Sequence, residues 1–191
     1  MNAASRRSSS LFLACLALAG FSGCETIRVV SDHDPSFSFA GYDSYAWISE
    51  HPMVSSAPGV NPLLEGRIMA AIQASLGAKG MKLAADPAQA DFVVAFGVGA
   101  RDRVSVTSTP YPVGYRGAWR WGGVYYNDVD VRQYTEGRLA IDIFDANEKR
   151  PVFHGYATAN ISATTDQAKR QQMLREAVAK ILAGFPPAPG S

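Results

Sequence analysis

Two segments of the chain carry apolar residues at helical spacing. The first set recurs every four residues, which places it on one face of a helix; it consists of Leu64, Ile68, Ile72 and Leu76. Asn61 is a good N-cap, and Pro62 suits the first helical position. The pattern therefore predicts a helix that begins at this pair and ends near Gly77.

The second helical stripe lies near the end of the chain. It consists of Met173, Leu174, Ala177, Val178, Ile181 and Leu182. Thr164 with Gln167 matches a capping box, in which each residue's side chain bonds the other's backbone N–H. Gly184 and Pro186-Pro187 are expected to end the helix.

Alternating apolar and polar residues predict five strands. These strands are expected at 25–30, 42–48, 91–98, 132–145 and 152–161. Val104 and Val106 continue the alternation of the third strand, and the fifth is expected to return antiparallel to the fourth. Residues 51–60 are expected to form a loop, and Asp32-His33-Asp34-Pro35 is expected to end the first strand.

These elements follow the order β-β-α-β-β-β-α, which predicts the α+β class. One apolar stripe on each helix and one apolar face on each strand imply a two-layer sandwich. In it, a largely antiparallel sheet is covered on one face by both amphipathic helices. We predict a single α+β domain over 25–187, entered through an anchor and first-strand segment at 24–30 and followed by a short tail at 188–191.

The N-terminus has the pattern of an export leader. Arg6 and Arg7 precede an apolar run over 11–21, and this run of about 11 residues is too short for the roughly 20 that span a bilayer. Small residues then precede Cys24, so residues 1–23 are predicted to form a cleavable signal peptide. An ordinary secreted protein, in which Cys24 is incidental, is the alternative.

The segment Phe21-Ser22-Gly23-Cys24 resembles the lipobox of bacterial lipoproteins. The resemblance implies that Cys24 is lipidated, for example with palmitate, and becomes the mature N-terminus. Three acyl chains on one residue would give lasting retention, since one chain binds a membrane only marginally. Glu25 is not the usual inner-membrane retention signal, so the resemblance favours an outer-membrane anchor that faces the periplasm.

Removal of the leader changes the charge and the cysteine content. Arg6 and Arg7 are lost, so 18 − 2 = 16 basic residues remain against 17 acidic ones, a net charge of −1. Without a basic stripe, nucleic acid is not an expected partner. Of the two cysteines, Cys15 lies in the leader and Cys24 would be acylated, so the remaining domain must be stabilised by its core rather than by disulfides.

Catalytic motifs are absent from the sequence. It contains no nucleophile elbow, phosphate-binding loop or HExxH helix. His33, His51 and His154 are scattered, and we predict neither a metal site nor a cofactor. Asp142 and Asp145 invite an acid–base hypothesis, but a solvated strand face and turn chemistry account for both. We therefore predict no catalytic residue and a non-enzymatic protein.

An aromatic, glycine-rich segment between the third and fourth strands is the candidate binding feature. Its candidate contact residues are Tyr115, Arg116, Trp119, Arg120, Trp121, Tyr125 and Tyr126. Aromatic rings stack on sugars or peptides, and arginine pairs with carboxylates. The segment therefore predicts an envelope protein or glycan partner, unless these rings pack on the sheet.

Several short motifs together resemble a known family. In chain order they are the leader with its cysteine, Asp32-His33-Asp34, Tyr42 to Trp47, Ala90 to Val94, Glu136 to Ala146, Phe153 to Ala157, and Phe185-Pro186-Pro187. Their order and spacing resemble the bacterial lipoproteins of domain of unknown function family 4136 (DUF4136). The family more often has Trp at the position of Phe153, a change that keeps an aromatic core contact. The resemblance implies the fold and an envelope location, but no activity.

Three hypotheses of function remain at this stage. The first is a lipid-anchored, non-enzymatic structural or binding module of the envelope. The second is an envelope hydrolase that acts on glycan or peptide through carboxylates such as Asp142. The third is an unanchored, secreted binding protein.

Overall fold

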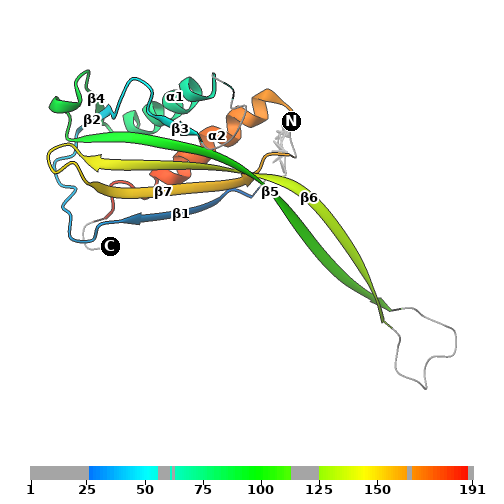
Figure 1. Cartoon of the computed structure of the whole chain (residues 1–191). Helices are drawn as coiled ribbons and strands as arrows, with labels where there is room; N and C mark the ends of the chain where they lie inside the picture. The colour runs from blue at the N-terminus through cyan, green and yellow to red at the C-terminus, as the bar shows by residue number, and fades with distance from the viewer. Residues whose placement is uncertain (1–25, 56–60, 62, 113–124, 163–164, 189–191) are drawn as a thin grey trace, which may run out of the picture.

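The computed structural model describes residues 26–55, 61, 63–112, 125–162 and 165–188. In this part of the chain the fold is α+β, with a mostly antiparallel, open, mixed sheet of seven strands and two α-helices (Figure 1). The strands are β1 Arg28–His33, β2 Ser44–Trp47, β3 Met53–Ser55, β4 Lys82–Leu83, β5 Phe92–Pro112, β6 Tyr125–Asp145 and β7 Pro151–Asn160. The helices are α1 Leu63–Gly77, the 3₁₀ helix η1 Pro87–Gln89, and α2 Gln167–Leu182.

The sheet has an antiparallel half and a parallel half. Its strand order is β1-β7-β6-β5-β2-β4, and β3 also pairs with β5. Neighbours among β1, β7, β6 and β5 are antiparallel, which confirms the predicted hairpin between the last two long strands. Strands β2 and β3 run parallel to β5, and β4 runs parallel to β2. Parallel neighbours need a crossover, and α1 lies within the connection from β2 and β3 to β5.

Two sequence predictions about the edges were wrong. Residues 51–60 are not entirely loop, because Met53–Ser55 forms β3, which is too short to show a period. Strand β1 does not end before Asp32 but continues to His33, which pairs with Phe153 of β7. Polar residues are tolerated there because β1 is an edge strand with one face in water.

The helical stripes form the core as predicted. Ile68, Ile72 and Leu76 of α1 are fully buried, and Leu64 packs at the margin of the same cluster. In α2 the buried residues are Ala177, Val178, Ile181 and Leu182. They join the inner face of the sheet, which we define by Phe92, Val94, Phe96, Ile141 and Ile143. Burial of each such side chain contributes about 1.5–3 kcal/mol.

The helix caps follow the prediction at α1 and differ at α2. Asn61 Oδ1 accepts a hydrogen bond of 2.9 Å from Leu63 N, so it caps α1. At α2 the N-cap is Asp166, whose Oδ1 accepts from Ala168 N at 2.8 Å. Thr164 of the predicted capping box lies outside the described residues. Asp166 lies two residues closer to the first turn of α2 than Thr164 does, and Asp is the stronger N-cap of the two residue types.

Aromatic rings fill one end of the core. Phe92 and Tyr42 stack with ring centroids 5.0 Å apart, and Phe185 meets Phe92 edge-on at 5.2 Å. Phe153 of β7 also contacts Phe185, at 5.3 Å. This cluster closes the end of the body at which β6 turns into β7.

At the other end β5 and β6 leave the body together. Their pairing continues through 12 residue pairs, from Arg101 opposite Glu136 to Pro112 opposite Tyr125. At about 3.4 Å per residue this two-stranded segment is roughly 40 Å long, and Figure 1 shows it twisting away from the helices. We call it the hairpin arm. β6 therefore begins at Tyr125 and not at the predicted Arg132.

Candidate functional site

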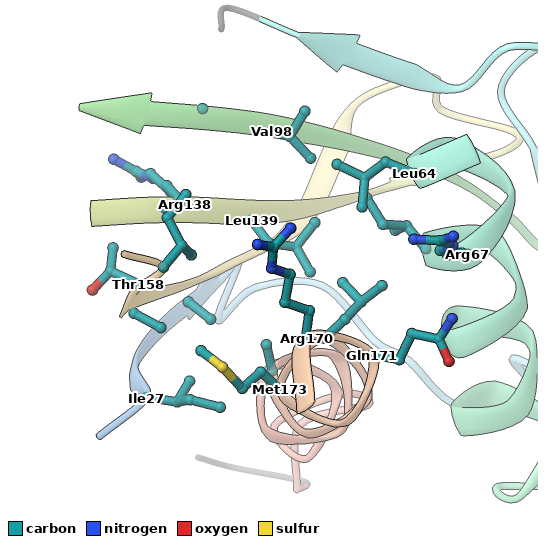
Figure 2. Close-up of a pocket in the computed structure, with 18 of the residues that line it drawn as sticks. Ile27, Leu64, Arg67, Val98, Arg138, Leu139, Thr158, Arg170, Gln171 and Met173 are labelled. Carbon is teal, nitrogen blue, oxygen red and sulfur yellow. The ribbon is translucent and has the colours of Figure 1, made fainter. Parts of the chain in front are cut away.

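A cleft opens between the two helices and the inner face of the sheet, at the root of the hairpin arm. Its volume is about 530 Å³, within the range of about 300–1,000 Å³ that is typical of small-molecule sites. Apolar side chains line it from both helices and from all three central strands (Figure 2). They include Ile27 before β1, Leu64 on α1, Val98 on β5, Leu139 on β6, Ala157 on β7 and Leu174 on α2.

The cleft exists because the residues at this end of the core are small. Its walls include Gly137, Ala157, Ala159 and Ala177. At the opposite end Phe92 and Phe185 fill the equivalent space and are fully buried. Protein interiors are otherwise close-packed. The gap between the two helices and the sheet is therefore caused by the small side chains at this end of the core.

Arginine and amide side chains border the cleft on its helix side. Figure 2 shows Arg67 extending from α1, and Arg170 and Gln171 from α2, beside the apolar side chains. Arg138 also borders the cleft, but its guanidinium carbon lies 3.8 Å from the ring centroid of Tyr156. None of the described residues that line the cleft is Asp or Glu.

A smaller, polar hollow of about 290 Å³ lies where β1, β6 and β7 meet the arm. Glu136 is its acidic residue, and its Oε1 lies 2.6 Å from Arg101 Nη2 and 3.4 Å from Arg103 Nη2. The hydrogen bond from Arg101 lowers the pKa of Glu136. This exposed ion cluster ties the two strands of the arm together at its root.

The outer face of the sheet carries the polar residues of β6 and β7. His154 Nδ1 lies 2.6 Å from Asp142 Oδ1, and the cation of Arg138 stacks on Tyr156. Asp142 therefore lies on a half-exposed strand face, as the alternation predicted. Neither of the two cavities described above contains Asp142, so the carboxylate pair of the hydrolase hypothesis is not assembled in them.

Asp145 is part of the protein's architecture. It is 4% exposed, and its Oδ1 accepts hydrogen bonds from the backbone N–H groups of Asn147 and Glu148 at 2.9 and 2.5 Å. Its Oδ2 accepts from the hydroxyl of Tyr42 at 2.8 Å. The turn chemistry predicted for Asp145 is confirmed, but the residue is buried rather than solvated.

A second carboxylate joins distant segments in the same way. Asp91 Oδ2 accepts hydrogen bonds of 2.7 Å from both the hydroxyl and the backbone N–H of Ser44. The hydroxyl bond is the main cause of the lowered pKa of Asp91. Both Asp91 and Asp145 are therefore accounted for by structural roles. No group of three His, Cys, Asp or Glu residues suited to a metal ion occurs in the described ranges.

The predicted lipidation site and the residues predicted to bind partners are only partly covered by the structure. Cys24, Tyr115, Arg116, Trp119, Arg120 and Trp121 lie outside the described residues. Tyr125 and Tyr126 begin β6, opposite Pro112 and Tyr111 of β5. The structure thus places the ends of the aromatic segment at the tip of the hairpin arm, a location that the alternation alone did not predict.

The described part of the arm exposes apolar side chains. Val104, Val106 and Val131 are 60%, 64% and 58% exposed. Val106 pairs with Val131, and all three continue the inner face of the sheet beyond the ends of the helices. Within the body this face is buried by α1 and α2, whereas on the arm it is open to water.

Sequence reasoning did not find the cleft or its arginines. The available signal for the cleft was the small size of the residues at the inward positions of β7. The inward positions of β6 carry bulky residues instead. Ala157 and Ala159 alternate with Tyr156 and Thr158, so the pattern showed a strand but not a gap above it. Because the gap depends on which residues of α1 and α2 lie opposite, no single segment reveals it.

The sheet, the helix pair and the arm define a single-sheet α+β domain. Residues 29–187 match the family model described as domain of unknown function (DUF4136). The chain belongs to this family, which confirms the resemblance seen in its motifs. No curated protein matches the chain.

The solved structures that match the chain include one from the same family. A DUF4136 family protein from Bacteroides thetaiotaomicron has a TM-score of 0.54 and 17% identity, with 85% of this chain and 97% of that chain covered. The PelC dodecamer from Paraburkholderia phytofirmans has a TM-score of 0.47 and 13% identity, with 83% and 96% covered. A PDZ domain protein from Parabacteroides distasonis ATCC 8503 has a TM-score of 0.47 and 14% identity, and the match covers 86% of this chain but 36% of that longer protein.

Within the described residues, neither α1 nor α2 is both long and apolar enough to cross a bilayer.

Proposed function

We propose that the protein is a non-enzymatic, lipid-anchored module of the cell envelope, held in the outer membrane and facing the periplasm. Its body is a two-layer domain, and its hairpin arm contacts a partner protein. The leader over 1–23 and the small residues before Cys24 support the anchor. The observation that carries the partner-binding part is the arm itself, a long strand pair with open edges.

The anchor has a direct test with a matched control. Cells that express the full chain are grown with radiolabelled palmitate, alongside the variants Cys24→Ser and Cys15→Ser. We expect label in the wild type and in Cys15→Ser, because Cys15 lies in the removed leader. We expect no label in Cys24→Ser. Equal labelling of all three proteins, or label in none, would contradict the proposal.

The arm offers a partner two kinds of contact. The backbone of Thr135 still bonds to Ile161 and Ser162 after β7. Beyond Thr135 neither strand of the arm has a neighbouring strand other than the opposite one among the described residues, so both edges present unpaired backbone N–H and C=O groups. Val104, Val106 and Val131 add exposed apolar surface between those edges. Proteins usually protect such edges, and an extended peptide binds them by adding a strand.

These contacts favour a protein partner over a glycan. Strand addition requires a second backbone with its own regular N–H and C=O groups, which a sugar chain lacks. Covering the exposed valines with an apolar surface stabilises a complex by about 25 cal/mol per Å² of apolar area buried. In the sequence, the aromatic segment with Trp119 and Trp121 lies between the two strands of the arm.

Site-specific photo-crosslinking tests the arm in living cells. A photoreactive amino acid replaces Val106 on the arm or, as a control, Val30 on the outer face of the body, where the side chain is 51% exposed. We expect a discrete protein adduct from position 106 and none from position 30. Equal adducts from both positions, or none from position 106, would rule out the arm as the contact.

The aromatic segment between β5 and β6 in the sequence is tested by combining this cross-link with Trp119→Ala and Trp121→Ala. If Trp119 and Trp121 contact the partner, the adduct from position 106 should weaken severalfold in the double variant. An unchanged adduct would exclude these two residues while leaving the strand edges as the binding feature.

A further inference from the structure

We propose that the cleft between α1, α2 and the sheet binds a long-chain fatty acid. Its acyl chain lies between the helices and the inner face of the sheet, and its carboxylate lies at Arg67 and Arg170. This inference concerns a different surface from the hairpin arm and goes beyond the proposed function. It is based on the shape, the wall chemistry and the charge of the cleft.

The space is built into the domain by side-chain size. Ala157 and Ala159 on β7 and Ala177 on α2 all line the cleft, where larger side chains would close the gap. The resulting volume of about 530 Å³ is of ligand size. Water in so apolar a space has few polar partners. Binding of an apolar ligand that displaces this water is therefore favourable.

The walls fit an aliphatic chain better than a ring system. Apolar contacts come from Ile27, Leu64, Val98, Met173 and Leu174, and no Phe, Tyr or Trp is among the described residues that line the cleft. Sites for aromatic ligands commonly supply rings for stacking. Met173 has an unbranched, adaptable side chain that can follow a chain of variable shape.

The charges at the cleft favour a ligand with an anionic head. Arg67 and Arg170 project beside the apolar walls, and Gln171 adds an amide (Figure 2). Arginine binds carboxylates through two parallel N–H groups. Glu65 is the acidic residue of α1, and it does not line the cleft; its Oε2 lies 3.4 Å from His51 Nδ1.

The cleft also lies close to the predicted anchor. Ile27 lines it, and three residues of extended chain span at most about 10 Å, so position 24 is within that distance along the chain. If the anchor is present, a membrane that supplies fatty acid is close at hand. An acyl group attached to Cys24 is the competing occupant, and the experiment must separate the two.

Photolabelling of the full chain in cells tests the inference. The probe is a palmitate analogue with a diazirine in its acyl chain, and labelled peptides are mapped by mass spectrometry. We expect labels on residues of the cleft, and excess palmitate should suppress them at least about tenfold. An analogue of equal chain length with an amine head should label these residues at least about tenfold less, because it lacks the carboxylate that the arginines bind. Labelling spread evenly over the surface, or equal labelling by the amine, would overturn the proposal.

Variants separate the apolar wall from the charged border. Ala159→Phe places a ring in the cleft and should remove the mapped labels. Arg67→Gln with Arg170→Gln, which keeps the apolar walls, should lower labelling by about tenfold. The control is Arg175→Gln, which removes an exposed charge of α2 outside the cleft. A loss in Arg175→Gln equal to that of the double variant would overturn the carboxylate assignment.

The variant Cys24→Ser distinguishes the free acid from the protein's own acyl group. If a free fatty acid is the occupant, labelling of the cleft is the same in wild type and in Cys24→Ser. Labelling that is weak in the wild type and rises in Cys24→Ser would overturn the proposal, because an attached acyl chain would then fill the cleft. The result does not depend on the hairpin arm, so failure here leaves the partner-binding proposal unaffected.

Discussion

The hydroxyl of Tyr42 donates a hydrogen bond of 2.8 Å to Oδ2 of Asp145, which lies 103 residues later in the chain. The contact joins the segment before β2 to the end of β6. Asp145 is 4% exposed, and its other oxygen is already bound to two backbone N–H groups of the following turn. A single tyrosine thus completes the hydrogen bonding of the turn that leads into β7.

Removal of that hydroxyl should destabilise the domain. Tyr42→Phe keeps the stacking on Phe92 but leaves one oxygen of a buried carboxylate without its donor. We expect a loss of about 1–3 kcal/mol in the free energy of unfolding, measured by urea denaturation. Tyr134→Phe, in a half-buried position on the hairpin arm, is the control and should change the free energy by less than about 0.5 kcal/mol. Equal losses in both variants would show that the hydrogen bond to Asp145 does not itself stabilise the domain.

The same contact predicts that the stability of the fold decreases at alkaline pH. Burial, and then the bond to Asp145, raise the pKa of Tyr42 above its ordinary value of 10.0. Above pH 10.0 the unfolded chain loses this proton while the folded chain keeps it. The stabilisation is therefore complete below that pH and is lost as the pH rises toward the folded pKa. Urea denaturation should show a shallower alkaline decline in Tyr42→Phe than in the wild type, and parallel declines would contradict this assignment.

An ion pair between Asp34 and Arg150 predicts that the stability of the fold decreases at acidic pH. The hydroxyl of Ser36, and next Arg150, lower the pKa of Asp34 from 3.8 to about 2. Stability from this group is present above pH 3.8 and is lost as the pH falls toward about 2, because the unfolded state takes up the proton first. Asp34→Asn should reduce the slope of stability in this window, measured by urea denaturation. The exposed Asp43→Asn is the control for the loss of one surface carboxylate, and an equal change of slope in both variants would contradict the assignment to Asp34.

Two glycines should respond in opposite directions to alanine. At Gly155 a new Cβ would lie 2.6 Å from Cγ2 of Ile181, which is fully buried, and 3.1 Å from the ring of Phe153. Such overpacking is expected to cost about 1–3 kcal/mol. At Gly66, inside α1, a Cβ would meet nothing within 4 Å, and alanine should stabilise the helix by about 0.5–1 kcal/mol. Thermal unfolding of both variants provides the comparison, and a shift of the same sign in both would refute it.

Periodicity predicted most of the regular structure because each helix and long strand buries one face. The stripe through Ile68 and Ile72 and the alternation through Ile141 and Ile143 are local patterns, and all four residues are fully buried. Boundaries were predicted less well. The segment before α2 contains several polar residues that could cap it, and the backbone conformation at Asp166 decides which one does.

Periodicity could not predict the features that depend on contacts between residues far apart in the sequence. Strand β3 has three residues and is held by its partner β5, so no internal pattern marks it. The arm continues only because β5 and β6 remain paired beyond Glu136. The cleft requires Ala157 and Ala177, 20 positions apart in the sequence, to be small at the same place in space.

By itself the sequence determined the α+β class, the two apolar helix faces, the alternating strands and the family, because these follow from local spacing and the order of short motifs. Only the tertiary structure decided that Asp145 is buried with Tyr42, that two strands extend beyond the helices, and that small residues from β6, β7 and α2 leave an arginine-bordered cleft. The physical reason is that burial, pairing and empty space are relations between side chains that the chain brings together only when it folds.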